Sequence, residues 1–188
     1  FIWTVTFATL SVLTTFALGL LLALALNKPI RGRRFYRSIL ILPYAMPSIM
    51  SILIWGGMFN TEFGAINNLL GTEIAWFQSA LFAKFAIILV NLWLGFPYFY
   101  LVSSGALQAI PSELLEAAAI DGATRIQQFR HITLPGLRPI FLVTCILETA
   151  WWFKHFTVIW LMTSGGPAGA TKVVSISIYQ QAFGDFNF

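Results

Sequence analysis

Residues 1–26 read FIWTVTFATLSVLTTFALGLLLALAL, and none of them carries a charge. An α-helix rises about 1.5 Å per residue, so about 20 apolar residues suffice to cross the hydrocarbon core of a membrane. The stretch therefore predicts a membrane-spanning helix. A cleaved signal peptide would have a basic start and a shorter apolar segment, and this stretch has neither.

Further apolar stretches follow along the chain. Residues 38–60 carry no charge but contain Pro43, Pro47 and the pair Gly56-Gly57, which predicts a kinked or broken helix. The sequence therefore predicts an all-α integral membrane protein, a polytopic helix bundle with about five spans in one transmembrane domain. Because the chain lacks an initial Met and stops within an apolar stretch, we interpret it as a fragment of a longer protein. The remaining spans are expected at residues 85–109, 139–163 and, as the start of a span, 173–188 of the domain at 1–188.

The overall composition fits a membrane protein. Hydrophobic residues make up 58% of the chain and charged residues 10%, whereas soluble domains contain roughly 25% charged residues. The 18 Phe and 7 Trp residues exclude a disordered chain. A single cysteine excludes a disulfide framework within the chain and a metal site made of cysteines alone.

Basic residues are concentrated in two connecting segments. The positive-inside rule places such segments in the cytoplasm, so we expect the chain to begin outside and its spans to alternate in direction. Nucleic-acid binding is an alternative for the first segment, but membrane topology and anionic lipid explain it more simply. The residues are Lys28, Arg31, Arg33, Arg34 and Arg37 in the first segment and Arg125, Arg130 and Arg138 in the second, against Lys84 and Lys172 on the opposite side.

The connection at residues 110–138 carries signals for structure of its own. Gly122 is typical of a helix end, and Thr124 followed by Gln127 is the sequence pattern of a capping box. Residues 132–135, Ile-Thr-Leu-Pro, predict the end of the second helix. We therefore expect a helix, a turn and a helix. Loops of this length are usually functional; the alternative is a solvated helix that packs under the bundle.

The sequence contains no convincing motif for nucleotide or metal chemistry. Residues 165–172 resemble a P-loop only loosely, because Lys172 does not directly follow a glycine and Val173 replaces the Ser or Thr. No histidine or cysteine spacing suggests a metal site, and Ser103-Ser104 has no evident base beside it. We therefore expect that the chain is not an enzyme and that energy for any active process comes from a partner.

Polar side chains within the fourth apolar stretch mark a candidate binding site. At 100° per residue, Glu148, Trp152 and His155 lie within about 60° of one another, and Trp151 borders this stripe. Lys154 points about 120° away from Glu148 on the same helix. Charged residues at this depth usually face protein or water rather than lipid. The stripe therefore predicts a polar surface inside the bundle.

The connecting loop resembles the EAA loop of bacterial ABC importer permeases. The matching pattern is Glu116-Ala117-Ala118, three residues, Gly122, nine residues, and Ile132-Thr133-Leu134-Pro135. The resemblance implies a helix bundle of the type I ABC importer kind in the bacterial cytoplasmic (inner) membrane. Motifs similar to those of maltose-type, binding-protein-dependent carbohydrate importers extend over nearly the whole chain and include Asp121-Gly122-Ala123, Phe129, residues 42–47 (LPYAMP), residues 93–98 (WLGFPY) and Gly165-Gly166-Pro167.

In that family the EAA loop contains a cytoplasmic coupling helix that docks on an ATPase subunit. The resemblance therefore implies several partners: a second permease subunit, two ATP-binding subunits that carry ATP and Mg, and an external solute-binding protein. Small side chains permit close docking, and acidic side chains can pair with basic groups of a partner. Asp121 alone is also compatible with a local helix cap. The residues to which the resemblance assigns ATPase coupling are Glu116, Ala117, Ala118, Asp121 and Gly122.

The resemblance also implies a substrate site between the third and fourth spans. Tyr98, which follows an expected interruption at Gly95 and Pro97, lies at a depth similar to that of the polar stripe, and transporter sites commonly lie near the midplane beside interrupted helices. Aromatic rings can stack on sugars, while a carboxylate and an imidazole can bind hydroxyls. The implied substrate-binding residues are Leu94, Gly95, Tyr98, Glu148, Trp152 and His155.

The fourth-span residues depart from the small and amide side chains of maltose-type permeases, which favours a ligand other than maltose. Contacts with the second permease are the alternative role for Glu148, Lys154 and His155, and packing is the alternative for the tryptophans. The functional hypothesis is a permease subunit of an ATP-driven importer that moves a sugar or sugar derivative by alternating access. A non-sugar solute, such as a polyamine or organic anion, is the alternative; a passive channel or scaffold would need no coupling segment.

Overall fold

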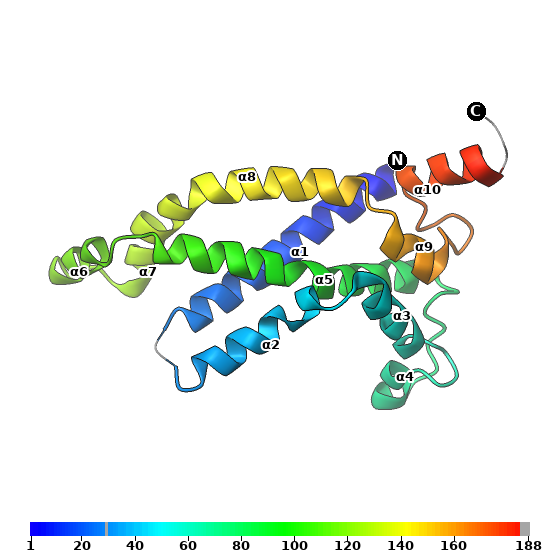
Figure 1. The fold of residues 1–188 in the computed structure, drawn as a ribbon, viewed down its shortest axis with the longest axis horizontal. Coiled ribbons are helices and arrows are strands. Elements are labelled where there is room, and N and C mark those ends of the chain that lie inside the picture. The colour runs from blue at the N-terminus through cyan, green and yellow to red at the C-terminus, as the bar shows by residue number, and fades with distance from the viewer. Residues whose placement is uncertain (29, 185–188) are drawn as a thin grey trace.

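The computed structural model describes residues 1–28 and 30–184. The described residues form helices joined by turns and loops, with the long helices side by side (Figure 1), which confirms the predicted all-α class. The long helices are α1 (Ile2–Leu26), α5 (Ala80–Gln108) and α8 (Leu134–Phe153). The shorter elements are α2 (Arg33–Ala45), α3 (Ser48–Met58), α4 (Ala65–Leu70), α6 (Ser112–Ile120), α7 (Arg125–Gln128), η1 (Phe129–Thr133), α9 (Thr157–Thr163), α10 (Val174–Tyr179) and η2 (Gln180–Gly184).

Helices α1 and α5 run in the same direction and pack against each other along the bundle (Figure 1). Two glycines permit their close approach. A Cβ atom at Gly19 would lie 2.6 Å from Phe99 Cβ, and one at Gly95 would lie 2.8 Å from Thr15 Cγ2. Because a larger residue would collide at both positions, the two backbones lie in direct contact. Helix α5 continues through Pro97, so the interruption expected there is absent.

The break predicted within residues 38–60 is confirmed. The axes of α2 and α3 differ by 94°, and the chain turns at Met46 and Pro47. Pro47 lacks an N–H and restricts Met46 to extended backbone, so α2 cannot continue through this point. As a result α2 packs along α5, whereas α3 packs against α9 at one end of the bundle.

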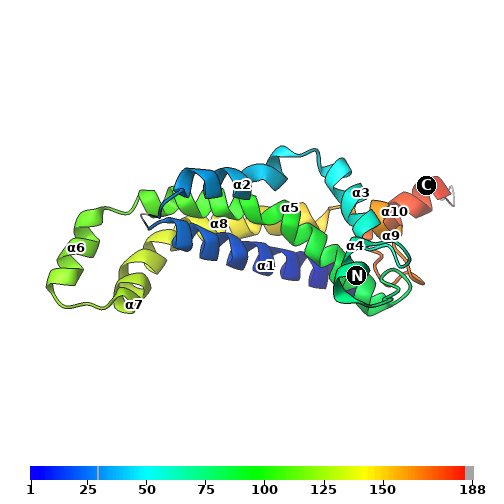
Figure 2. The ribbon, with the colours of Figure 1, turned by 90° about the horizontal axis from the view of Figure 1, so that it is seen from below.

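Both basic connecting segments lie at the same end of the bundle, as expected from their charge. One joins α1 to α2, and the other leads from α5 through α6 and α7 toward α8 (Figures 1 and 2). We call this the basic end, and we call the end with α4 and α9 the opposite end. The positive-inside rule assigns the basic end to the cytoplasm.

Elements α7, η1 and α8 form one continuous helical run. The capping box predicted at its start is confirmed: the backbone N–H of Gln127 donates to Thr124 Oγ1, and the Thr124 backbone N–H donates to Gln127 Oε1 at 2.7 Å. The helix end predicted at residues 132–135 is wrong. The π-helical segment η1 widens the helix just before Pro135, and the missing N–H of Pro135 falls in the first turn of α8.

Helix α8 begins and ends earlier than the span predicted over residues 139–163. The chain leaves α8 at Lys154, passes His155 and then forms α9, so the predicted span is two helices. Neither proline nor glycine marks this break. The hydroxyl of Ser175 donates a hydrogen bond of 3.0 Å to the backbone carbonyl of His155, which satisfies a carbonyl that the helix no longer uses.

The described residues contain three helices long and apolar enough to cross a membrane, or four spans if the bent pair α2–α3 counts as one. The sequence predicted about five spans. Elements α10 and η2 together are too short to cross, and residues 185–188 of the fifth predicted span lie outside the described residues. Large apolar side chains are exposed on the outer faces of the bundle, as is typical of surfaces that meet lipid or further helices; examples are Leu13, Leu21, Leu42, Val143 and Ile146.

A buried asparagine holds the loop around α4 at the opposite end. Asn67 is 3% exposed, and its Oδ1 accepts a hydrogen bond of 2.8 Å from Trp76 Nε1. Its Nδ2 donates to the backbone carbonyls of Thr61 and Ile74 at 3.1 and 3.0 Å. The Asn67 side chain therefore connects the segments before and after α4 to the Trp76 indole, which packs on Phe59.

Candidate functional site

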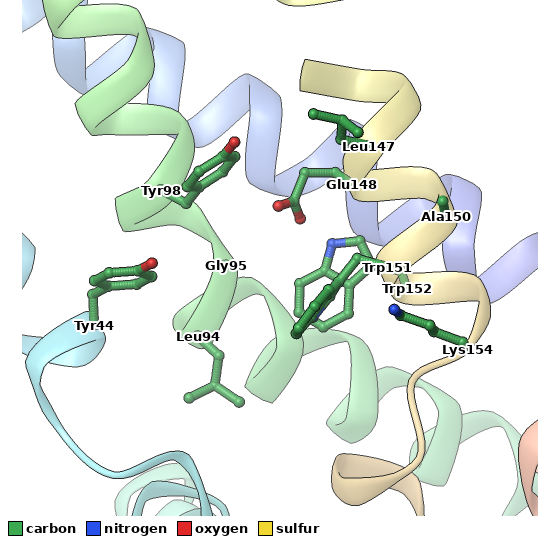
Figure 3. Close-up of a pocket in the computed structure, with 10 residues that line it drawn as sticks. All are labelled: Tyr44, Leu94, Gly95, Tyr98, Leu147, Glu148, Ala150, Trp151, Trp152 and Lys154. Atoms are coloured by element: carbon green, nitrogen blue, oxygen red, sulfur yellow. The ribbon is translucent and has the colours of Figure 1, made fainter. Parts of the chain in front are cut away.

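A cavity of about 500 Å³ lies between α5 and α8, with the end of α2 beside it (Figure 3). Figure 3 shows Tyr98 of α5 and Glu148 of α8 directed toward each other across this space. Aromatic rings and a carboxylate therefore share one concave surface at the depth of the membrane-spanning helices. The lining residues are Tyr44, Leu94, Gly95, Tyr98, Leu147, Glu148, Ala150, Trp151, Trp152 and Lys154.

The structure brings most of the predicted substrate-binding residues together at this cavity. The exception is His155, which does not line it; its ring packs against Trp152, with ring centroids 4.9 Å apart. His155 Nδ1 is buried and has no hydrogen-bond partner among the described residues. Whether these residues bind a solute stays a prediction. Those that line the cavity are Leu94, Gly95, Tyr98, Glu148 and Trp152.

Trp152 is fixed in place by packing. It is 5% exposed, its ring meets Phe7 edge to face at 6.5 Å, and a Cβ atom at Gly95 would lie 3.0 Å from its Cζ2. Its indole Nε1 is buried without a hydrogen-bond partner among the described residues, and Figure 3 shows this nitrogen on the side of Glu148. A rigid indole therefore presents an unused N–H next to a carboxylate.

Lys154 and Trp151 form the rim of the cavity. The Lys154 ammonium lies 4.8 Å from the centroid of the Trp151 ring, a cation–π contact. The sequence placed Lys154 about 120° away from Glu148 on a continuing helix. In the structure Lys154 is the residue at which α8 ends, and its side chain lines the cavity.

Three further side chains with polar or aromatic groups line the cavity and were not predicted there: Tyr44, Trp151 and Lys154. Tyr44 reaches the cavity only because of the 94° bend that follows α2, and no local pattern encodes its distance from α5. Trp151 borders the polar stripe of Glu148, Trp152 and His155, so a stripe defined over a wider angle would have predicted it. A prediction of Lys154 at the cavity would have required knowing where α8 ends.

The predicted coupling residues lie where another protein can reach them. Helices α6 and α7 project beyond the basic end of the bundle (Figure 2), and none of their residues is buried. The predicted end of the first helix is confirmed: α6 ends at Ile120, Gly122 has φ +80°, and the Ala123 N–H donates to Ala118 O at 2.8 Å. Their role in coupling stays a prediction. These residues are Glu116, Ala117 and Ala118 in α6, with Asp121 and Gly122 in the turn after it.

A second, shallower cavity of about 320 Å³ lies between α6 and the start of the long helical run. Three of the predicted coupling residues line it: Ala118, Asp121 and Gly122. His131 lies on the other side, and its Nδ1 is 2.9 Å from the backbone carbonyl of Gln127. The turn after α6 is therefore part of a concave, exposed surface.

Comparisons with known proteins agree on the family. The family model described as "binding-protein-dependent transport system inner membrane component" matches residues 15–186. The maltose/maltodextrin transport system permease protein MalF of Vibrio cholerae is 44% identical over 196 residues, which cover 97% of this chain and 37% of that protein. The MalF protein of Klebsiella aerogenes is 43% identical, with 97% and 38% covered. The chain thus spans well under half the length of these relatives.

Solved structures support the same assignment of fold. A chain of a bacterial ABC transporter involved in the import of the acidic polysaccharide alginate superposes with a TM-score of 0.88 at 25% identity, covering 98% of this chain and 67% of that one. The methionine ABC transporter MetNI, at 21% identity and a TM-score of 0.59, shares the fold. The predicted type I ABC importer permease fold is thereby confirmed, and the chain belongs to the family of binding-protein-dependent transport system inner membrane components.

Proposed function

We propose that this chain forms the solute-conducting half of an ATP-driven importer and moves a sugar or sugar derivative inward by alternating access. One observation carries the proposal. The helical run that starts in the exposed α7 continues without interruption to Glu148 and Trp152 at the cavity. A displacement of the projecting end therefore reaches the cavity through a single helix.

The chain's own residues perform two tasks in this mechanism. At the basic end, Glu116 and Asp121 are exposed for pairing with a partner surface, and the small side chains of α6 allow close docking. At the cavity, Tyr98 and Trp152 offer aromatic surface, and Glu148 accepts hydrogen bonds from solute hydroxyls. Rotation of α8 relative to α5 changes the side from which this cavity is open.

In this proposal, partner proteins supply the ATP hydrolysis, the other half of the pathway and the delivery of the solute. Two ATPase subunits carrying ATP and Mg drive closure at α6, a second permease completes the pathway, and an external solute-binding protein delivers the solute. Support comes from the family, whose description names a binding protein, and from a related alginate transporter structure in complex with a periplasmic protein bound to an alginate pentasaccharide. The sugar class is supported by the maltose/maltodextrin permeases, which are 42–44% identical to this chain over the 196 aligned residues.

The decisive experiment uses the complete permease, co-expressed with the second permease and the ATPase of the same importer and reconstituted in vesicles. We expect uptake of labelled sugar that requires ATP and the binding protein. Uptake without ATP would instead indicate a channel.

Crosslinking tests the coupling role directly. Glu116→Cys carrying a crosslinker should capture the ATPase subunit, whereas Glu62→Cys, exposed beside α4 at the opposite end, should not. Equal capture from both positions, or capture from neither, would contradict docking at α6.

The cavity can be tested separately from assembly. Tyr98→Ala should lower sugar uptake at least severalfold while ATPase association stays unchanged, because the side chain faces the cavity. Tyr36→Ala, at the exposed start of α2, is the matched control and should leave uptake intact. Loss of assembly in Tyr98→Ala would assign this residue to packing.

A further inference from the structure

The carboxylate of Glu148 has no cationic partner in the part of the chain that the structure describes. Of the described residues that line the cavity, Lys154 alone is cationic. Its ammonium lies over the Trp151 ring at 4.8 Å, and Figure 3 shows it beside the tryptophan rings, apart from the Glu148 carboxylate. The positive charge at the rim is thus held by an aromatic ring rather than by the acid.

An unpaired acidic side chain at this depth is costly. Charged groups within membrane-spanning helices persist where they face a partner charge or a water-filled cavity, and they commonly mark a solute pathway. Glu148 is half-buried and directed into the cavity, and the indole N–H of Trp152 is the nearby donor that Figure 3 shows on its side. Even a hydrogen bond from this single N–H would leave most of the acceptor capacity of the carboxylate unused. A cationic group entering the cavity would pair with it.

The remaining walls fit the same kind of ligand. Tyr44 and Tyr98 lie on the side of the cavity that faces Glu148, and Trp152 borders the carboxylate (Figure 3). Aromatic faces attract cations and stack on the apolar faces of sugar rings. The volume of about 500 Å³ lies within the range of small-molecule sites. Carboxylate and aromatic surface together are suited to a ligand with both a sugar ring and a positive charge.

We propose that the cavity accepts an amino sugar, whose protonated amine pairs with the Glu148 carboxylate between the aromatic walls. This inference rests on the proposed function, because it takes the cavity between α5 and α8 as the solute site. It adds a substrate class, since a neutral disaccharide would leave the carboxylate without a counter-charge.

Direct binding tests the proposal without involving the binding protein or ATP. The assembled importer in lipid nanodiscs is titrated with a β-1,4-linked diglucosamine and, separately, with its neutral N,N′-diacetyl form. The heat of binding or the change in tryptophan fluorescence gives the affinity for each sugar. The wild type should bind the diamine at least about tenfold more tightly, the scale of one charge-assisted hydrogen bond. Glu148→Gln should abolish this preference, whereas Glu148→Asp should retain it.

Controls separate the remaining explanations. Glu73→Gln, in an exposed loop at the opposite end, should keep the wild-type preference. Equal binding of the two sugars by the wild type would overturn the proposal, as would a Glu148→Gln variant that loses the second permease, because Glu148 would then pair with that subunit. Tight binding of diglucosamine without any ATP-driven sugar uptake would instead count against the proposed function.

Discussion

The backbone of Gly95 in α5 lies directly against the indole of Trp152 in α8, so that a Cβ atom at residue 95 would lie 3.0 Å from Trp152 Cζ2. This contact joins the two helices that form the cavity, and it sets where the buried indole of the lining can lie. The glycine is required here for space, since its φ is not in the left-handed region.

We therefore predict that Gly95→Ala displaces Trp152 and narrows the cavity. Overpacking of this kind typically costs about 1–3 kcal/mol, so sugar binding should weaken and the thermal midpoint of the purified assembly should fall. Gly105→Ala is a matched control on the same helix, because nothing lies within 4 Å of its added Cβ. Equal behaviour of the two variants in binding and thermal assays would show that the contact is unimportant.

Gly19 should be less tolerant than Gly95. An added Cβ would lie 2.6 Å from Phe99 Cβ and 2.7 Å from the Tyr100 backbone nitrogen, and the backbone of α5 cannot move aside as a side-chain tip can. We predict that Gly19→Ala lowers the yield of folded, membrane-inserted protein severalfold, measured by gel filtration in detergent. Gly56→Ala in α3, where the added Cβ meets open space, should give the wild-type yield.

Gly122 is required for its backbone angle rather than for space. Its φ is +80°, and nothing lies within 4 Å of an added Cβ. A β-branched residue in this region costs roughly 1–3 kcal/mol, so Gly122→Val should distort the turn after α6 and lower sugar transported per ATP hydrolysed. Asn tolerates this backbone region better, and Gly122→Asn should retain more coupling. Wild-type coupling in both variants would remove this turn from the transmission path.

Asn67 should be essential for the loop at the opposite end. Asn67→Ala removes the acceptor of Trp76 Nε1 and both donors to the loop carbonyls, and each buried group left unsatisfied costs about 1–3 kcal/mol. We predict faster proteolysis of this loop in vesicles that expose it. Asn68→Ala, at the exposed neighbouring position, should match the wild type. Similar cleavage rates in the two variants would refute the role of the buried amide.

Local signals allowed several features to be predicted from the sequence. The capping box at Thr124 and Gln127 and the helix end at Gly122 depend on neighbouring residues only, and both are present in the structure. The break at Pro47 is equally local, because proline restricts its own backbone and that of the residue before it. The long apolar stretches predicted the membrane-spanning helices, because the thickness of the hydrocarbon core sets the length of such a helix.

Features that depend on tertiary contacts were not predictable in this way. The end of α8 has no proline or glycine, and Ser175, distant in the sequence, satisfies the carbonyl at the break. Consequently Lys154 was not predicted at the cavity, and His155 was expected there although its ring packs against Trp152. Tyr44 reaches the site through the bend between α2 and α3, whose angle no spacing rule determines.

The close contacts between α1 and α5 have a consequence for changes in chain length. Thr15 contacts Gly95, and Gly19 contacts Phe99. The two contacts are the same number of residues apart on α1 as on α5, so both depend on one shared alignment of two parallel helices. A residue inserted between Thr15 and Gly19 would turn the rest of α1 by about 100° and carry Gly19 away from its partner. The same insertion in the turn from α1 to α2 would leave both contacts intact, so evolutionary length variation should be confined to such turns.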